Sequence, residues 1–269
     1  MEISTFGFLI FGYAALIGGF IWEGGNPSGL FSPSSLLIIF GGTFAAVAVS
    51  FPLNDIKKFG KIIGVAFKKE KTDMGALISY FKNIAFKTRK EGLLSIEELI
   101  SGDDVDPFVK KGLQMVVDGV EPQSVKGTLE LSVELLVERH EVGISIFEGA
   151  GGYSPTMGII GTVLGLVNVL ANMSDTSTLG EKISKAFIAT LYGISTANLV
   201  WLPIAARLKR INANEITEKS LIIEAILGIQ EGVNPNTLEE RLKGFLDKKQ
   251  LAAYENSLEN PNDAGSEQS

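Results

Sequence analysis

Two long apolar segments in the middle of the chain constrain its fold more than any other feature. They cover residues 152–173 and 186–206, and neither contains Asp, Glu, Lys, Arg or His. A helix rises about 1.5 Å per residue and a bilayer core is about 30 Å thick, so each segment is long enough to cross a membrane. We therefore expect both to be transmembrane helices.

Small residues recur at helical spacing along one face of each segment. The set consists of Pro155, Gly158, Gly161, Thr162 and Gly165 in the first segment and Thr190, Gly193 and Ala197 in the second. Helices with such faces approach one another closely in lipid, where van der Waals fit and hydrogen bonds hold bundles together. The glycines and Ala197 are therefore expected at a helix packing interface.

The missing charges limit what these segments can do alone. A cation or proton site inside a membrane normally needs an ionisable group, because a bare ion in hydrocarbon is very costly. If this chain helps to move a cation, another chain must supply the carboxylate.

The composition agrees with a membrane protein that has a substantial soluble part. The chain has 269 residues, of which 45% are hydrophobic and 20% charged. The net charge of −7 argues against nucleic acid as a partner, and the absence of cysteine excludes disulfides and thiol catalysis. The sequence shows no catalytic nucleophile, metal-ligand cluster or phosphate-binding loop, so it does not suggest an enzyme. The single histidine, His140, is expected to be solvated or ion-paired.

Two further spans are expected near the N-terminus, at residues 4–22 and 34–51. The first lacks the basic start and cleavage site of a secretory signal. Lysines follow the second span and basic residues follow the fourth, whereas the loop of residues 23–33 has none, so both termini are expected in the cytoplasm. Lys182 and Lys185 oppose this orientation but are outnumbered.

The expected fold class is all-α, an integral membrane protein with four transmembrane helices and a helical cytoplasmic domain. The expected regions are residues 1–52 (two spans), 53–150 (cytoplasmic helical domain), 151–206 (two spans), 207–254 (cytoplasmic C-terminal helices) and 255–269 (disordered acidic tail). Helices are expected to begin at Pro107 and Pro122, and Asn234 or Asn236 to cap one that ends near Lys249. The helix from Pro122 is expected to run into the third span, either unbroken or with a break at residues 149–152.

Three segments resemble one family. They are YSPTMGIIGTVLGLV (153–167), ATLYGISTANLVWLPIA (189–205) and RKEGLLSIEE (89–98). Together with the four-span layout they are similar to the MotA/PomA stator subunits of the bacterial flagellar motor, within the wider MotA/TolQ/ExbB ion channel family.

The resemblance implies a cation-driven torque generator in the bacterial inner membrane that serves motility and chemotaxis. Five copies would surround a dimer of a single-span MotB-type partner, whose membrane aspartate binds the translocated H⁺ or Na⁺. No cofactor is implied. The torque would act on the rotor switch protein FliG.

The resemblance also assigns roles to residues of the spans. Pro155 and Pro203 would couple ion occupancy to conformation, and the alternative is that they are static kinks. Thr162 and Thr190 would line the ion pathway, with Thr162 favouring sodium. The alternative is that each hydroxyl bonds to a carbonyl of its own helix.

In the cytoplasmic insert the resemblance assigns the rotor contact to Arg89 and Glu97. The alternative is an ordinary solvated charged surface. Ser95 and Glu98 also fit the spacing of a helix capping box, which would explain Glu98 locally.

Two other functions remain open at this point. One is an energiser subunit like ExbB or TolQ, which look like three-span proteins. The other is a membrane scaffold that oligomerises through its glycine faces and conducts nothing.

Overall fold

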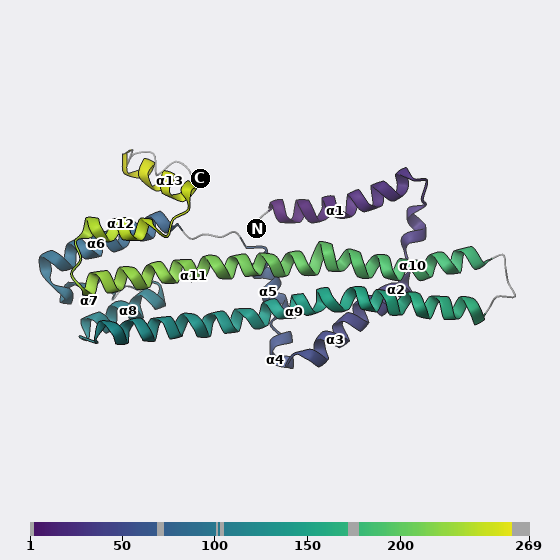
Figure 1. The fold of residues 1–269 in the computed structure, drawn as a ribbon, viewed down its shortest axis with the longest axis horizontal. Helices are drawn as coiled ribbons and strands as arrows, with labels where there is room; N and C mark the ends of the chain where they lie inside the picture. Colours follow the sequence, from purple (N-terminus) through teal and green to yellow (C-terminus); the bar gives the residue numbers. More distant parts are fainter. Residues whose placement is uncertain (1–2, 69–72, 101, 103–104, 172–177, 260–269) are drawn as a thin grey trace. The chain divides into compact units, whose positions relative to one another are not determined.

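The computed structural model describes residues 3–68, 73–100, 102, 105–171 and 178–259, which form helices and their connections without any strand. They divide into two compact units (Figure 1). The transmembrane unit comprises Met1–Glu70 and Arg139–Asn212, and the insert unit comprises Lys71–Glu138 and Ala213–Ser269. The all-α prediction is confirmed.

The described residues contain four helices long and apolar enough to span a membrane, as predicted. The first is α1 (Ile3–Trp22), and the second combines α2 (Pro33–Leu36), the π-helix η2 (Leu37–Gly41) and α3 (Gly42–Ser50). The third is the apolar end of α9 (Pro122–Ala171). The fourth combines α10 (Leu179–Thr196), the π-helix η5 (Ala197–Trp201) and the start of α11 (Leu202–Gln230). A 3-10 helix, η1 (Pro27–Leu30), and the short helices α4 (Leu53–Ile56) and α5 (Phe59–Ala66) complete the unit.

Helix α9 is continuous, so the alternative of a break at residues 149–152 is wrong. Glycines disfavour a helix interior, but here the helix is packed on other elements. A Cβ atom on Gly149 would lie 3.4 Å from the ring of Phe51, and one on Gly151 only 2.5 Å from the side chain of Leu202. Tertiary packing therefore preserves the helix where the local sequence weakens it.

The π-helix η5 ends at Trp201, two residues before Pro203. Proline has no N–H, so the carbonyl of Leu199, four residues earlier, loses its α-helical partner. The Leu202 N–H reaches back five residues to the carbonyl of Ala197. The sequence predicted a bend at Pro203, and the structure shows this wider turn instead.

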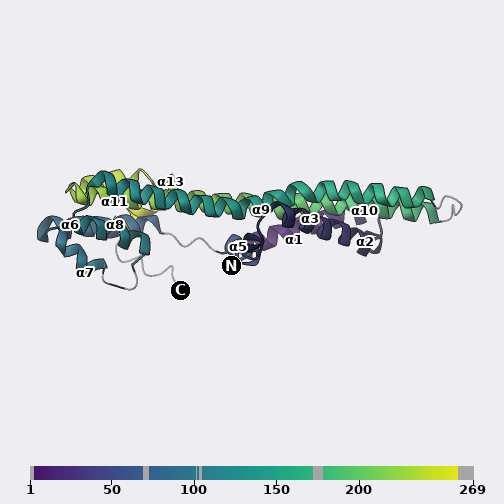
Figure 2. The same ribbon diagram turned by 90° about the horizontal axis from the view of Figure 1, so that it is seen from below.

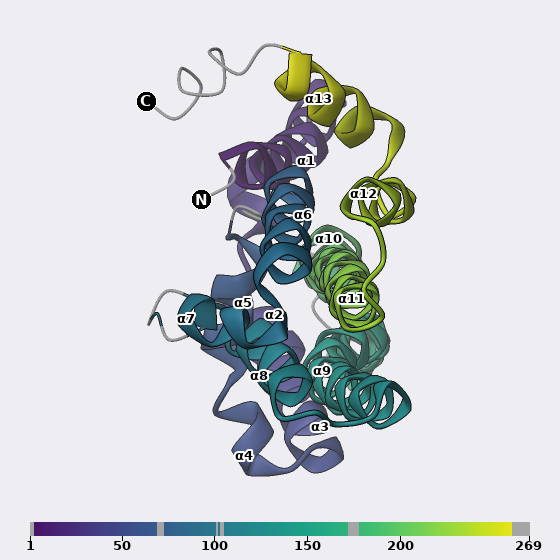
Figure 3. The same ribbon diagram turned by 90° about the vertical axis from the view of Figure 1, so that its left-hand side faces the viewer.

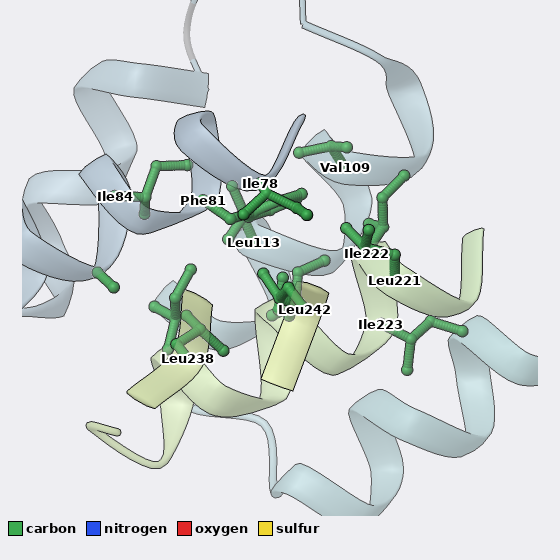
Figure 4. Close-up of a cluster of buried hydrophobic side chains, with 14 of the residues drawn as sticks. Ile78, Phe81, Ile84, Val109, Leu113, Leu221, Ile222, Ile223, Leu238 and Leu242 are labelled. Carbon is green, nitrogen blue, oxygen red and sulfur yellow. The ribbon is translucent and has the colours of Figure 1, made fainter. Parts of the chain in front are cut away.

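The insert unit packs short helices around the polar halves of α9 and α11. These helices are α6 (Met74–Glu91), η3 (Leu93–Ser95), α7 (Ile96–Ile100), α8 (Pro107–Val117), α12 (Pro235–Lys243) and α13 (Lys248–Glu259). Their apolar faces form one core, in which Phe81, Leu113 and Leu238 are fully buried (Figure 4). The Asp106 carboxylate accepts from the Phe108 N–H and so caps α8 before Pro107, and the Asn234 side chain caps α12 in the same way.

The C-terminal helices differ from expectation. The helix expected to end near Lys249 is two helices, and α12 and α13 both pack against α6 (Figure 3). Tyr254 on α13 is buried, and its hydroxyl donates to Glu239 at 2.8 Å. Residues 255–259, for which disorder was predicted, belong to α13. The rest of the predicted tail, residues 260–269, lies outside the described residues.

Candidate functional site

Helices α9 and α10 of the transmembrane unit lie side by side (Figures 1 and 2) and are in backbone contact. A Cβ atom on Gly193 would lie 2.5 Å from the carbonyl oxygen of Ser154 and 3.1 Å from Cα of Gly158. A Cβ atom on Gly158 would lie 3.1 Å from Cα of Thr190. The two backbones touch here, and only glycine permits that distance.

The other small residues of the predicted packing set lie along the same interface. A Cβ atom on Gly161 would come within 2.7 Å of the Ala189 methyl group, and one on Gly165 within 2.5 Å of the Ala186 methyl group. Ala197 is buried in η5. The structure thus places this set where two helices meet.

Thr162 and Thr190, the two candidate ion-pathway residues, are brought together across this interface. Their hydroxyl oxygens lie 2.5 Å apart. Thr162 Oγ1 is also 3.0 Å from the carbonyl oxygen of Ala186 and 3.2 Å from that of Gly158. Thr190 Oγ1 lies 3.2 Å from the same Gly158 carbonyl oxygen. Thr162 thus contacts a carbonyl of its own helix, as the alternative expected, and also oxygens of α10. Each hydroxyl has one proton and two lone pairs, and the bond between the two hydroxyls uses only one of their four lone pairs, so lone pairs remain for another ligand.

A second hydroxyl pair was missed by the sequence analysis. Ser154 is fully buried, and its Oγ lies 2.8 Å from Oγ1 of Thr196 and 3.1 Å from the carbonyl of Gly193. The sequence could have indicated Ser154, because it precedes Gly158 and Thr162 by four and eight residues and so lies on the same helix face. We call the four side chains Ser154, Thr196, Thr162 and Thr190 the hydroxyl ladder. Its two pairs flank the contact of Gly158 with Gly193.

The two candidate coupling prolines lie beside features of this interface. Pro155 is half-buried in α9, directly after Ser154 of the hydroxyl ladder. Pro203 is exposed and is the second residue of α11, two residues after the end of η5. Pro155 thus follows a residue whose side chain bonds to the neighbouring helix. Pro203 follows a π-helical turn.

His140 is more enclosed than predicted. It is half-buried, and its Nδ1 lies 2.9 Å from Oδ1 of Asn212, which joins α9 to α11 within the transmembrane unit. The sequence predicted a solvated or ion-paired side chain, and it could not identify Asn212 as a partner, because Asn212 lies on a helix distant in sequence.

The candidate rotor-contact residues are exposed on the insert unit. Arg89 lies in the last turn of α6 and Glu97 in the first turn of α7. Between them Gly92 has a φ of +86°, a conformation that suits glycine and turns the chain at this point. The turn brings two exposed charges of opposite sign onto one connection between helices.

The expected capping box at this turn is wrong. The Ser95 hydroxyl donates to the carbonyl of Gly92 at 2.7 Å, and the Glu98 carboxylate accepts from Lys87 at 2.9 Å. The hydrogen bond from Lys87 lowers the pKa of Glu98, and the same bond raises the pKa of Lys87. The ion pair thus accounts for Glu98.

Comparisons with known proteins match most of the chain. Residues 102–220 match the MotA/TolQ/ExbB proton channel family, and residues 5–92 match the N-terminal region of motility protein A. Motility protein A of Bacillus subtilis is 39% identical over 90% of this chain and 89% of that protein.

Two solved structures have a similar fold. The flagellar MotAB stator complex from Bacillus subtilis contains a chain that is 38% identical, with a TM-score of 0.85 over 91% of this chain and 96% of that one. The C. jejuni MotAB structure contains a chain that is 30% identical, with a TM-score of 0.87 over 92% and 97% of the two chains.

The contact between α9 and α10 predicts that substituting alanine for two glycines of the transmembrane unit has opposite effects on stability. Gly193→Ala places a methyl group against the Ser154 carbonyl, which is backbone and cannot rotate away, so we expect a lower melting temperature of the purified protein in detergent. Gly152→Ala has open space and should raise stability by about 0.5–1 kcal/mol through helix propensity. Equal melting temperatures for the two variants would contradict the close contact.

Proposed function

The chain belongs to the MotA/TolQ/ExbB proton channel family, and on this premise we propose how it works as a stator subunit of the bacterial flagellar motor. It is an inner-membrane protein, and a MotB-type chain is its partner. Four candidate spans and similarity to motility protein A along both units favour the stator over an energiser like ExbB or TolQ.

The observation that carries the proposal is the hydroxyl ladder in an interface whose two spans contain no charged residue. The titrating aspartate belongs to the partner, and five copies of this chain surround a dimer of that partner. Hydroxyl and carbonyl oxygens of the Thr162 and Thr190 pair replace part of the hydration shell of the passing H⁺ or Na⁺. The chain needs no cofactor for this role.

Ion occupancy drives rotation only if it changes the contacts between helices. The helices α9 and α10 touch through backbone at Gly158 and Gly193, so even a small movement of one displaces the other. Neither Pro155 nor Pro203 donates a backbone hydrogen bond, so the spans can bend at these positions when the partner's aspartate changes charge. The prolines thus couple the state of the partner's aspartate to the position of α9 and α11.

The insert unit delivers the torque. With the lysines that follow the second span placed in the cytoplasm, both termini and the insert unit are cytoplasmic. Arg89 and Glu97 then meet a patch of both charge signs on FliG, through exposed contacts that form and release quickly.

The proline variants separate a coupling role from an inert scaffold. Pro155→Ala and Pro203→Ala should give cells that assemble flagella but do not swim, because a complete helix no longer bends. Pro52→Ala, at an exposed connection outside the spans, should swim normally. Swimming speed and the amount of protein in the membrane are measured together. Normal swimming of both variants at normal protein levels would support the scaffold.

The ion pathway is tested with Thr162→Val, which keeps the shape and removes the hydroxyl. Loss of one hydrogen-bonding or ligating group costs about 0.5–1.5 kcal/mol, so the sodium concentration at half-maximal speed should rise roughly 2- to 12-fold. Swimming is measured at varied sodium with the proton gradient held fixed. Thr156→Val, whose hydroxyl bonds the Tyr153 carbonyl on an exposed face, is the control. If wild-type speed does not depend on sodium, the sodium assignment is wrong.

If Arg89 and Glu97 contact the rotor, reversing their charges should reduce torque but leave the stator complex assembled in the membrane. Arg89→Glu and Glu97→Lys should each reduce torque in tethered cells, while the complex still forms in the membrane, because both side chains are exposed. Lys110→Glu, an exposed reversal on α8, should leave torque unchanged. Loss of the Arg89 and Glu97 variants from the membrane would assign these residues to folding instead.

A further inference from the structure

The two pairs of the hydroxyl ladder differ in their access to solvent. Ser154 is 0% exposed and Thr196 is 7% exposed, whereas Thr162 and Thr190 are half-buried. A passing ion cannot ligate a hydroxyl that is completely enclosed by protein. Ser154 and Thr196, which we call the buried pair, therefore have a different task from Thr162 and Thr190, which we call the threonine pair.

The buried pair joins the two helices by a directional bond. Its hydroxyl oxygens lie 2.8 Å apart, and Ser154 Oγ also lies 3.1 Å from the carbonyl oxygen of Gly193. Thr196 Oγ1 lies 2.7 Å from the carbonyl oxygen of Tyr192 in its own helix. Both acceptors that the structure offers to the Ser154 proton belong to α10, so a hydrogen bond crosses from α9 to α10 whichever of them accepts it.

The buried pair lies where the α-helical part of the fourth span ends. The N–H of Ala197, the first residue of η5, donates to the Gly193 carbonyl, which is the carbonyl that Ser154 Oγ faces. The Ser154 carbonyl oxygen in turn lies so close to Gly193 that a Cβ atom there would be only 2.5 Å away. Ser154 thus holds α10 at its last turn before the backbone widens.

The contacts between α9 and α10 follow one antiparallel register. In order along α9 they are Ser154 with Thr196, Gly158 with Gly193, Thr162 with Thr190 and Gly165 with Ala186. Contacts of glycine and methyl groups have no preferred direction, whereas a hydrogen bond weakens steeply with distance and angle. A slip by one residue turns a side chain by about 100° around its helix and would separate both hydroxyl pairs.

We propose that Ser154 and Thr196 are positioning residues for ion translocation, which hold α9 and α10 in register while an ion passes the threonine pair. The inference rests on the proposed ion pathway. A threonine hydroxyl that ligates a cation turns a lone pair toward it, and this competes with the bond between Thr162 and Thr190. The threonine pair cannot hold the register during that step, and the buried pair, which no ion reaches, keeps its bond throughout.

The test measures how much driving ion each variant needs. Swimming speed is recorded at varied sodium with fixed pH and at varied pH with fixed sodium, so that wild type identifies the driving ion. Ser154→Ala and Thr196→Val each remove one hydroxyl with little change of shape. Each should raise the ion concentration at half-maximal speed about threefold, the shift that one average hydrogen bond between membrane helices produces. Maximal speed and the amount of protein in the membrane should stay at the wild-type level.

Further variants separate positioning from a contribution to stability alone. Thr196→Ser keeps the hydroxyl and removes only a methyl group, so it should keep the wild-type half-maximal concentration. Ser154→Ala should add nothing to the effect of Thr162→Val, because it acts only through the threonine pair. Ser195→Ala is the matched control, since the Ser195 hydroxyl donates at 3.3 Å to the Tyr192 carbonyl of its own helix, and it should behave like wild type.

Thr162→Val distinguishes failure of this inference from failure of the proposed function. If Thr162→Val raises the half-maximal ion concentration but Ser154→Ala and Thr196→Val do not, the positioning role is wrong and the ion pathway stands. The positioning role is also wrong if these two variants lower only the maximal speed or the amount of protein, or if the effects of Ser154→Ala and Thr162→Val multiply. If Thr162→Val has no effect, the ion pathway is wrong and the positioning role is wrong with it.

Discussion

The structure depends on the contact of two backbones at Gly158 and Gly193. In lipid no hydrophobic force pulls helices together, so their association relies on close van der Waals fit and on hydrogen bonds between them. The glycines provide the fit, and the serine and threonines on either side provide the hydrogen bonds. The same proximity that stabilises the pair also brings hydroxyl and carbonyl oxygens of two helices together at Thr162 and Thr190. The packing contact and the oxygens to which we propose to assign the ion pathway therefore share one interface.

Much of the transmembrane unit could be predicted from the sequence, because span length and small-residue spacing report directly on the membrane. The meeting of Thr162 with Thr190 could not be derived in this way, since helical spacing fixes a face but not the register between two helices. His140 with Asn212 and Tyr254 with Glu239 were missed for the same reason. Each pair joins residues that are distant in sequence, and only the tertiary fold brings them together.

Local patterns also failed where tertiary contacts opposed them. The glycines at 149–152 suggested a possible break, but α9 is continuous through them and is packed against neighbouring side chains there. Ser95 and Glu98 have the spacing of a capping box, but the Glu98 carboxylate accepts a hydrogen bond from Lys87 instead. In contrast, Asp106 and Asn234 cap their helices as expected, because proline fixes the backbone directly after each cap. The roles of Pro155, Pro203, Arg89 and Glu97 remain predictions from the family resemblance.

The wide turn at η5 alters how the whole fourth span presents its surface. Such a turn holds one residue more than an α-helical turn, and each residue advances an α-helix by about 100°. Every side chain from Leu202 onward is consequently rotated by about that angle relative to a helical wheel drawn from Thr190. Pro203 and Arg207 therefore point in directions that an uninterrupted α-helix would not give them. One inserted residue thus lets a single span offer glycine and threonine to one neighbour and arginine to another.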